Sequence, residues 1–318
     1  MSLLRERLED EVELPVPRRP STERVVSSDL RLLHRLGDVW RHRELLISLV
    51  RKELKVKYKN SVLGFLWSML NPALTIVIFW IVFGKIFKNQ VHLFALFMMC
   101  GLVAWNVFQA ALPSATTAVV DNAGIVKKVS FPREILPLAP VGAALYLSLL
   151  QAVVLVLALA IFRIAPSLSY LPLLVPAIVA LILFTSAMAM FLSAVNVYLR
   201  DMKHLVEVML MAWFWATPVV YYFEQVAPRL PPHGLPTWLP MLNPMTDVVM
   251  TFQRALYGAQ SITRVAGHPS VVIQVLPAGV GPMWYLTALL ITIGVSAVLY
   301  VGALALFVHL EGNFAEEM

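Results

Sequence analysis

The residues best suited to binding chemistry are cations. Residues 51–59 hold five of them, and Arg51, Lys52, Lys55 and Lys59 share one arc of a helical wheel drawn at roughly 100° per residue. A cation near an anionic membrane surface contributes roughly 1 kcal/mol of attraction. The cluster therefore predicts a surface that attracts anionic headgroups, either those of ordinary lipid or that of a specific ligand.

Groups for catalysis are scarce. Glu207 is the acidic residue that falls within an apolar run, near its end, where a side chain often reaches back to the interface. The seven histidines are scattered, and no cluster has metal-ligand spacing. Neither G-x-S-x-G nor the phosphate loop G-x-x-x-x-G-K-[ST] occurs. We expect no enzyme activity, metal or cofactor on this chain.

The composition is that of a polytopic membrane protein. The chain is 59% hydrophobic and 14% charged, with a mean hydropathy of +0.76, whereas an ordinary soluble domain is about 25% charged. Residues 1–43 are polar and lack the apolar stretch of a signal peptide, so we expect the first span to direct insertion. Cys100 has no partner for an intramolecular disulfide and is interpreted as a small buried apolar residue.

The apolar runs predict an all-α fold with six spans, since about 20 apolar residues cross a bilayer. The expected spans are 65–87, 92–115, 135–162, 172–199, 205–223 and 283–309. With the amino terminus inside, the inner segments hold 19 of the 25 Lys and Arg residues. Both termini are therefore expected in the cytoplasm, and the net charge of +6 is attributed to topology rather than to nucleic acid.

Two regions precede the six-span domain, residues 65–312. Residues 1–43 are expected to form a cytoplasmic tail that ends in a short helix, and residues 44–64 an amphipathic helix in the headgroup plane. On this helix Glu53 and Lys57 intrude on the apolar side, at a spacing and order that favour an ion pair.

The long outer connection, residues 224–282, is partly apolar and predicts short helices that dip into the outer leaflet. Such backbone needs protein cover or a wet cavity, which favours a gate. The alternative, that these helices cap the bundle and have no gating role, is also compatible with the sequence.

Energy for transport would have to come from an ion gradient or a separate subunit. A gradient-driven carrier usually places carboxylates or broken helices at mid-membrane. The middle of these spans is nearly free of charge, which favours the separate subunit.

Four motifs, in this order, resemble ABC-2 type permeases that export cell-surface polysaccharides. They are Tyr58 to Pro72 (YKNSVLGFLWSMLNP), Asn122 to Leu136 and especially FPREILP at 131–137, NVYLRD at 196–201, and Leu242-Asn243-Pro244 followed by Arg254. The resemblance covers about residues 30–312.

The resemblance implies a homodimer of six-span subunits in the bacterial plasma (inner) membrane, joined to two copies of an ABC ATPase that carries ATP and Mg. The implied substrate is a polyprenyl-pyrophosphate-linked glycan: O-antigen, teichoic acid, capsule or galactan. The cations of residues 51–59 would then capture its anionic head.

Three further groups receive expected roles. Aromatic rings could line a sugar channel, or else form the interfacial belt and pack a dimer: Phe79, Trp80, Phe83, Trp213, Phe214, Trp215, Tyr221, Tyr222 and Phe223. Inner-loop residues could couple the permease to the ATPase, or merely fix its orientation: Lys127, Lys128, Phe131, Pro132, Arg133, Glu134, Arg200 and Asp201. The expected outer gate comprises Asn243, Pro244 and Arg254.

Two other functions remain open. One is an ABC-2 exporter of a lipid or drug. The other is a membrane glycosyltransferase, for which the outer loop offers only Glu224 and Asp247 as carboxylates.

Overall fold

The computed structural model describes residues 32–59, 61, 63–87, 91, 93–127, 131–258, 261–264, 271–277, 279–312 and 314. The expected tail up to about residue 28 and the coupling candidate Lys128 lie outside these residues.

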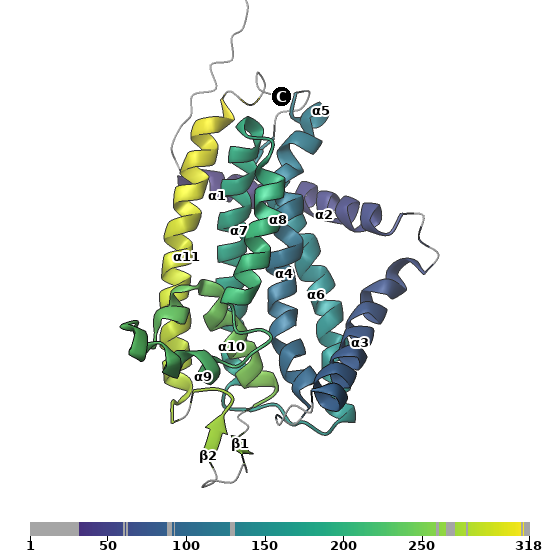
Figure 1. The fold of residues 1–318 in the computed structure, drawn as a ribbon. Helices are drawn as coiled ribbons and strands as arrows, with labels where there is room; N and C mark the ends of the chain where they lie inside the picture. Colours follow the sequence, from purple (N-terminus) through teal and green to yellow (C-terminus); the bar gives the residue numbers. More distant parts are fainter. Residues whose placement is uncertain are drawn as a thin grey trace, which may run out of the picture.

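The described chain is a bundle of long helices (Figure 1). Five are long and apolar enough to cross a membrane. They are α3 (Trp67–Phe79) with its π-helical continuation η2 (Trp80–Ile86), α4 (Phe94–Asp121), α6 (Ile135–Ile161), η3 (Leu171–Leu173) with α7 (Leu174–Tyr198), and α11 (Pro282–Glu311). These spans confirm a multi-pass, largely helical membrane protein.

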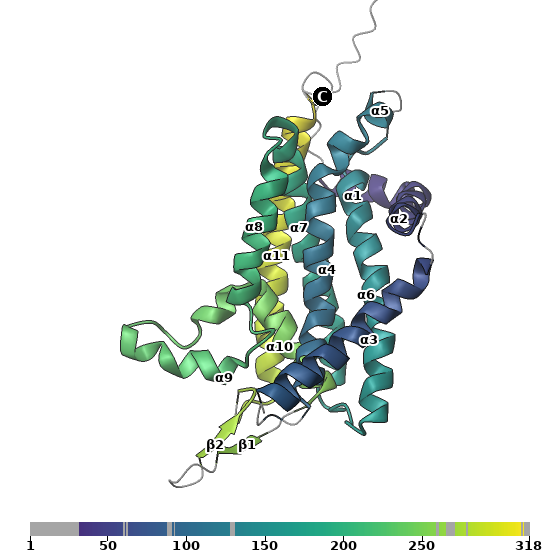
Figure 2. The same ribbon diagram turned by 45° about the vertical axis from the view of Figure 1, so that its right-hand side comes forward.

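Helix α4 is the centre of the bundle and α3 its most peripheral member. In the most apolar 18 residues of each span, 83% of the residues are buried in α4 but only 6% in α3 with η2. The α4 ring of Phe108 stacks on Phe184 of α7, with centroids 5.4 Å apart. Helix α3 runs obliquely along the outside of the bundle (Figure 2). Much of its surface is therefore left for lipid or for another chain.

The helix expected over residues 205–223 is shorter than predicted. Helix α8 (Met202–Ala216) has 15 residues, about 22 Å at 1.5 Å per residue, whereas the hydrocarbon core is about 30 Å thick. It ends because Pro218 forces the preceding residue out of helical geometry: Thr217 has φ −109° and ψ 132°. A continuous fifth span to residue 223 was therefore a wrong prediction.

The amino-terminal helices α1 (Leu32–Arg41) and α2 (Arg43–Lys57) lie near one end of the bundle, and α2 runs across the long helices (Figures 1 and 2). Helix α2 packs on α6, with Leu49 buried. Gly142 permits this approach, because a Cβ there would lie 2.8 Å from Cγ2 of Val50. The short helix α5 (Ala123–Val126) and the carboxyl end of α11 lie at the same end.

The opposite end holds the segment between α8 and α11. It comprises α9 (Phe223–Val226), the 3₁₀ turns η4 (Ala227–Arg229), η5 (Pro231–His233) and η6 (Leu239–Leu242), α10 (Pro244–Leu256), and an antiparallel hairpin of β1 (Ser261–Arg264) and β2 (Val271–Gln274). The sequence predicted only helices here, so the hairpin is an addition. A further 3₁₀ turn, η1 (Gly64–Leu66), precedes α3.

Candidate functional site

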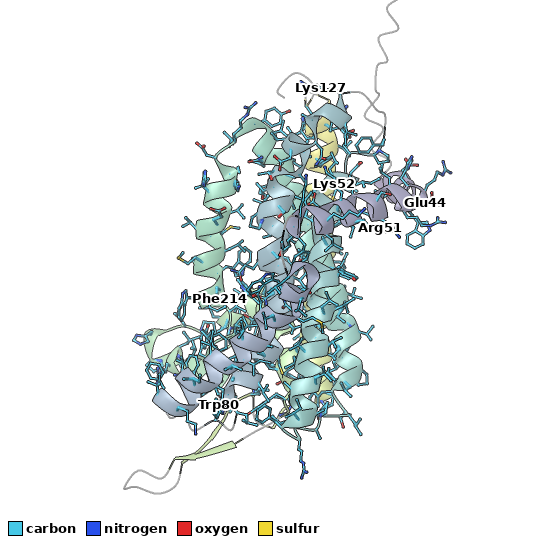
Figure 3. All side chains as sticks on the ribbon, turned by 90° about the vertical axis from the view of Figure 1, so that its right-hand side faces the viewer. Glu44, Arg51, Lys52, Trp80, Lys127 and Phe214 are labelled. Atoms are coloured by element: carbon cyan, nitrogen blue, oxygen red, sulfur yellow. The ribbon has the colours of Figure 1, made fainter. Side chains whose placement is uncertain are left out.

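The cations on α2 and just after it divide into two groups. Arg51, Lys55 and Lys59 are exposed. Lys52 instead donates from Nζ to Oδ1 of Asn122 at 2.6 Å, and Asn122 donates in turn to the carbonyl of Ala118. Figure 3 shows Arg51 and Lys52 on α2, with Lys127 beyond them at the end of the molecule. Arg51, Lys55 and Lys59 are therefore available to an anion, whereas Lys52, although also exposed, fastens α2 to the end of α4.

A polar groove, which the sequence reasoning missed, lies beside the end of α2. Three adjoining cavities of about 320, 270 and 160 Å³ share Lys57 and Leu147 in their walls. The smallest is also lined by Asn106, Gln109 and Gln151. We call these three cavities the polar groove.

Lys57 has a distinct setting in this groove. The side chain is exposed in part, and the partial burial of its ammonium lowers the pKa from the ordinary value. No ion pair among the described residues joins it to Glu53, although both line the cavity of about 320 Å³. The expected i,i+4 pair is therefore not formed. A signal was present in the sequence, because Asn106, Gln109 and Gln151 interrupt otherwise apolar spans.

The inner-loop residues are held by the carboxyl end of α11. Nε of Arg133 lies 3.5 Å from Oε1 of Glu311, and Nη1 of Arg133 donates to the backbone oxygen of Glu311 at 2.8 Å. Tyr198 donates to the carbonyl of Leu310 on the same helix end. Glu134 is buried, Phe131 and Pro132 are half-buried, and Lys127, Arg200 and Asp201 are exposed. The loop thus offers an exposed edge while Arg133 anchors it to α11.

The aromatic candidates lie in different environments. Trp213 packs against Phe108 and Phe184, and Phe214 lies beside Trp105. Trp80 and Trp215 are 42% and 64% exposed.

The remaining aromatic candidates are partly or fully covered. Phe79, Phe83, Tyr221 and Tyr222 are half-buried and Phe223 is buried. Phe83 contacts Phe79 and Phe94 edge to face. The rings therefore do not form one continuous surface in a single chain, and their channel role stays a prediction.

The expected gate residues join α10 to its neighbours. Asn243 caps α10 by accepting from the backbone nitrogen of Met245, and accepts from the indole of Trp213 at 2.8 Å. Pro244 begins α10, where a missing backbone N–H costs nothing. Arg254 lies 4.5 Å from the ring centroid of Tyr170 and donates to its hydroxyl.

Helix α10 is also tied to the last span. Thr292 of α11 donates to Oδ2 of the buried Asp247 at 2.6 Å. At Gly101 of α4, a Cβ would come within 2.9 Å of the Gln253 amide, so α4 and α10 are in close contact. These contacts hold α10 against α4 and α11.

In the part of the chain that the structure describes, no group of three or more His, Cys, Asp or Glu residues could hold a metal ion.

Five apolar helices in a largely helical bundle define a multi-pass membrane protein. A match to the family described as ABC-2 type transporter spans residues 44–257. The chain belongs to the ABC-2 type transporter family.

Relatives of established function carry one name. The chain is 32% identical over 228 residues to the O-antigen export system permease protein RfbA of Myxococcus xanthus, which covers 71% of this chain and 85% of the relative. It is 28% identical over 224 residues to a protein of the same name from Klebsiella pneumoniae, covering 70% and 83%. The resemblance to permeases of polysaccharide export is thereby confirmed.

Proposed function

We propose that the chain is the permease subunit of an ATP-driven exporter that moves a polyprenyl-pyrophosphate-linked polysaccharide out of the cytoplasm. O-antigen is the substrate class that the relatives' names support. The observation that carries the proposal is the position of α2, which lies beside the bundle near one end (Figures 1 and 2). Arg51 and Lys55 on this helix, and Lys59 just after it, are exposed. A pyrophosphate at headgroup depth would meet these cations first.

The proposed topology has six spans with both termini in the cytoplasm of the inner membrane. Helix α8 alone is too short to span, but Trp213 and Thr217 at its end are hydrogen bonded to Asn243 at the start of α10. Helices α8 and α10 would then complete the fifth crossing together, with α10 entering from the outer side as a re-entrant gate. The burial of ten α10 residues supports this, because protein must cover backbone at that depth.

Membership of the family implies pairing with an ABC ATPase, and we assign ATP and Mg to that subunit. The inner loops near α5 and Arg200 offer exposed edges for docking. The poorly buried α3 leaves an apolar surface that a second copy could cover, as the proposed homodimer requires.

Reconstitution tests the function directly. The permease is co-expressed with its ABC ATPase, purified as a complex and placed in proteoliposomes with a polyprenyl-pyrophosphate-linked oligosaccharide. We expect copurification of the ATPase and movement of the glycan that requires ATP and stops with vanadate. Movement of phospholipid or drug in place of the glycan would favour the alternative ABC-2 exporter, and transfer of a sugar to an acceptor would favour a glycosyltransferase.

Fusions test the topology. A reporter that is active only in the cytoplasm should be active at both termini and inactive in the hairpin that contains β1 and β2. A reporter that is active at one terminus and inactive at the other would show five crossings rather than six.

A further inference from the structure

The polar groove has two properties that lipid-facing surfaces lack. Asn106 is the thirteenth of the 28 residues of α4, and Gln151 the seventeenth of the 27 residues of α6, so both lie near mid-helix. Polar side chains at such depth are costly and usually functional. The groove also begins at Lys57, where the basic helix α2 ends.

The amides satisfy one another only in part. Nδ2 of Asn106 donates to Oε1 of Gln151 at 2.9 Å, and the indole of Trp105 donates to Oε1 of Gln109 at 2.8 Å. Gln109 is exposed, and within the described residues its amide nitrogen makes no hydrogen bond. Each side-chain amide has an NH₂ group that donates and a carbonyl oxygen that accepts. The three amides can therefore bind a ligand that has hydrogen-bond donors and acceptors.

The rest of the wall fits the same chemistry. Ser114 and Ser61 add hydroxyls, whereas Leu147 and Pro140 add apolar surface. Sugar rings present hydroxyls at their edges and C–H groups on their faces. A cation at one end of the groove suits a phosphate attached to the first sugar.

We propose that the groove of Lys57, Asn106, Gln109 and Gln151 binds the phosphate-proximal sugars of the lipid-linked substrate. Lys57 contacts the phosphate, and the amides contact sugar hydroxyls. This rests on the proposed function, since it assigns the substrate a place beside α2, α4 and α6. It adds a second site to the proposed capture of the pyrophosphate by Arg51, Lys55 and Lys59, and it gives sugar contact to amide side chains as well as to the aromatic rings expected from the sequence.

Cysteine accessibility tests whether the groove is wet. Cys100, the one cysteine of the chain, is buried, so the wild-type complex gives the background. In the permease–ATPase complex in proteoliposomes, Gln109→Cys and Gln151→Cys are treated with a charged, membrane-impermeant thiol reagent. The matched control is Leu149→Cys, two residues from Gln151 on α6 and 65% exposed.

We expect Gln109→Cys and Gln151→Cys to react at least about tenfold faster than Leu149→Cys. Contact with lipid should raise the pKa of the Leu149→Cys thiol by about one unit, which lowers its reactive thiolate fraction about tenfold. Equal rates would overturn the proposal. Disulfide-linked dimers of Gln151→Cys in place of labelling would overturn it too, because the groove would then be an interface with a second copy.

Protection distinguishes the possible ligands. A polyprenyl-pyrophosphate-linked oligosaccharide should slow labelling of Gln151→Cys several-fold, whereas phosphatidylglycerol and sugar-free polyprenyl pyrophosphate should not. Protection by phosphatidylglycerol to the same extent would show an ordinary lipid headgroup in the groove and would overturn the sugar assignment.

A paired substitution adds a functional readout. Replacing both partners of a hydrogen bond with apolar groups of similar shape can leave stability nearly unchanged. Asn106→Leu with Gln151→Leu should therefore lower glycan export while ATPase copurification and melting temperature stay normal; normal export would contradict the proposal. A failure of the proposed function would appear separately, as absence of ATP-dependent glycan export by the wild-type complex, whatever the labelling shows.

Discussion

The indole nitrogen of Trp213 donates to Oδ1 of Asn243 at 2.8 Å, and the same oxygen accepts from the backbone nitrogen of Met245. Nδ2 of Asn243 donates to the hydroxyl of Thr217 at 2.8 Å. One side chain thus joins the end of α8 to the start of α10. Helix α8, which is too short to cross the membrane alone, and helix α10 are therefore connected by the side chain of Asn243.

Asn243→Ala should weaken this connection. The change removes a helix cap worth about 1 kcal/mol and leaves the Trp213 indole without its acceptor, at about 1–3 kcal/mol. We expect a lower melting temperature of the purified permease and reduced export. Asn243→Asp keeps the acceptor and the cap, so it should lose less; equal melting of all three proteins would contradict the role of Asn243.

The triple change Arg51→Gln, Lys55→Gln and Lys59→Gln should reduce export more than it reduces folding. These exposed cations make no described hydrogen bond to the bundle, and their loss removes roughly 1 kcal/mol of headgroup attraction each. Export and protein level are measured in the same cells. Normal export at normal protein level would end the headgroup-capture hypothesis.

Lys52→Met serves as the contrasting variant on the same helix. It removes the donor to Asn122, at about 1 kcal/mol, so the melting temperature should fall. Thermal stability of the triple variant should remain near that of the wild type, and the opposite ranking would show that Lys52 does not fasten α2.

Phe131→Ala combined with Arg133→Ala should uncouple ATP hydrolysis from export, because Arg133 holds the inner loop against Glu311. ATPase rate and glycan movement are measured together in the reconstituted complex. Glu311→Gln is the control: it weakens the ion pair but retains the backbone acceptor, and should uncouple only in part. Full coupling in the double Ala variant would refute this role.

Gly142→Ala should release α2 from α6. An added Cβ would lie 2.8 Å from Cγ2 of Val50, and overpacking costs about 1–3 kcal/mol. Combining it with Val50→Ala should restore the melting temperature. Gly294→Ala on α11, where nothing lies within 4 Å of the added Cβ, should be neutral or slightly stabilising; destabilisation of equal size there would deny the special packing at Gly142.

Much of the fold could be predicted because a bilayer imposes strong rules on sequence. Apolar runs of about 20 residues mark spans without reference to neighbours, and five of the expected six appear as helices of sufficient length. The fifth apolar run does not form one continuous helix, because Pro218 forces Thr217 into an extended conformation and ends α8 at Ala216. The hairpin at 261–274 escaped notice because pairing of two short strands depends on register across the turn.

The site was less predictable, since it depends on which side chains the fold brings together. The sequence by itself determined the membrane class, the family motifs and the basic helix, because these follow from composition and local order. Only the tertiary structure decided that Lys52 binds Asn122, that Arg133 is held by Glu311, and that Lys57 meets Asn106, Gln109 and Gln151. The members of the first two pairs are 70 and 178 residues apart in the chain, and helix packing sets the distances between all of these partners.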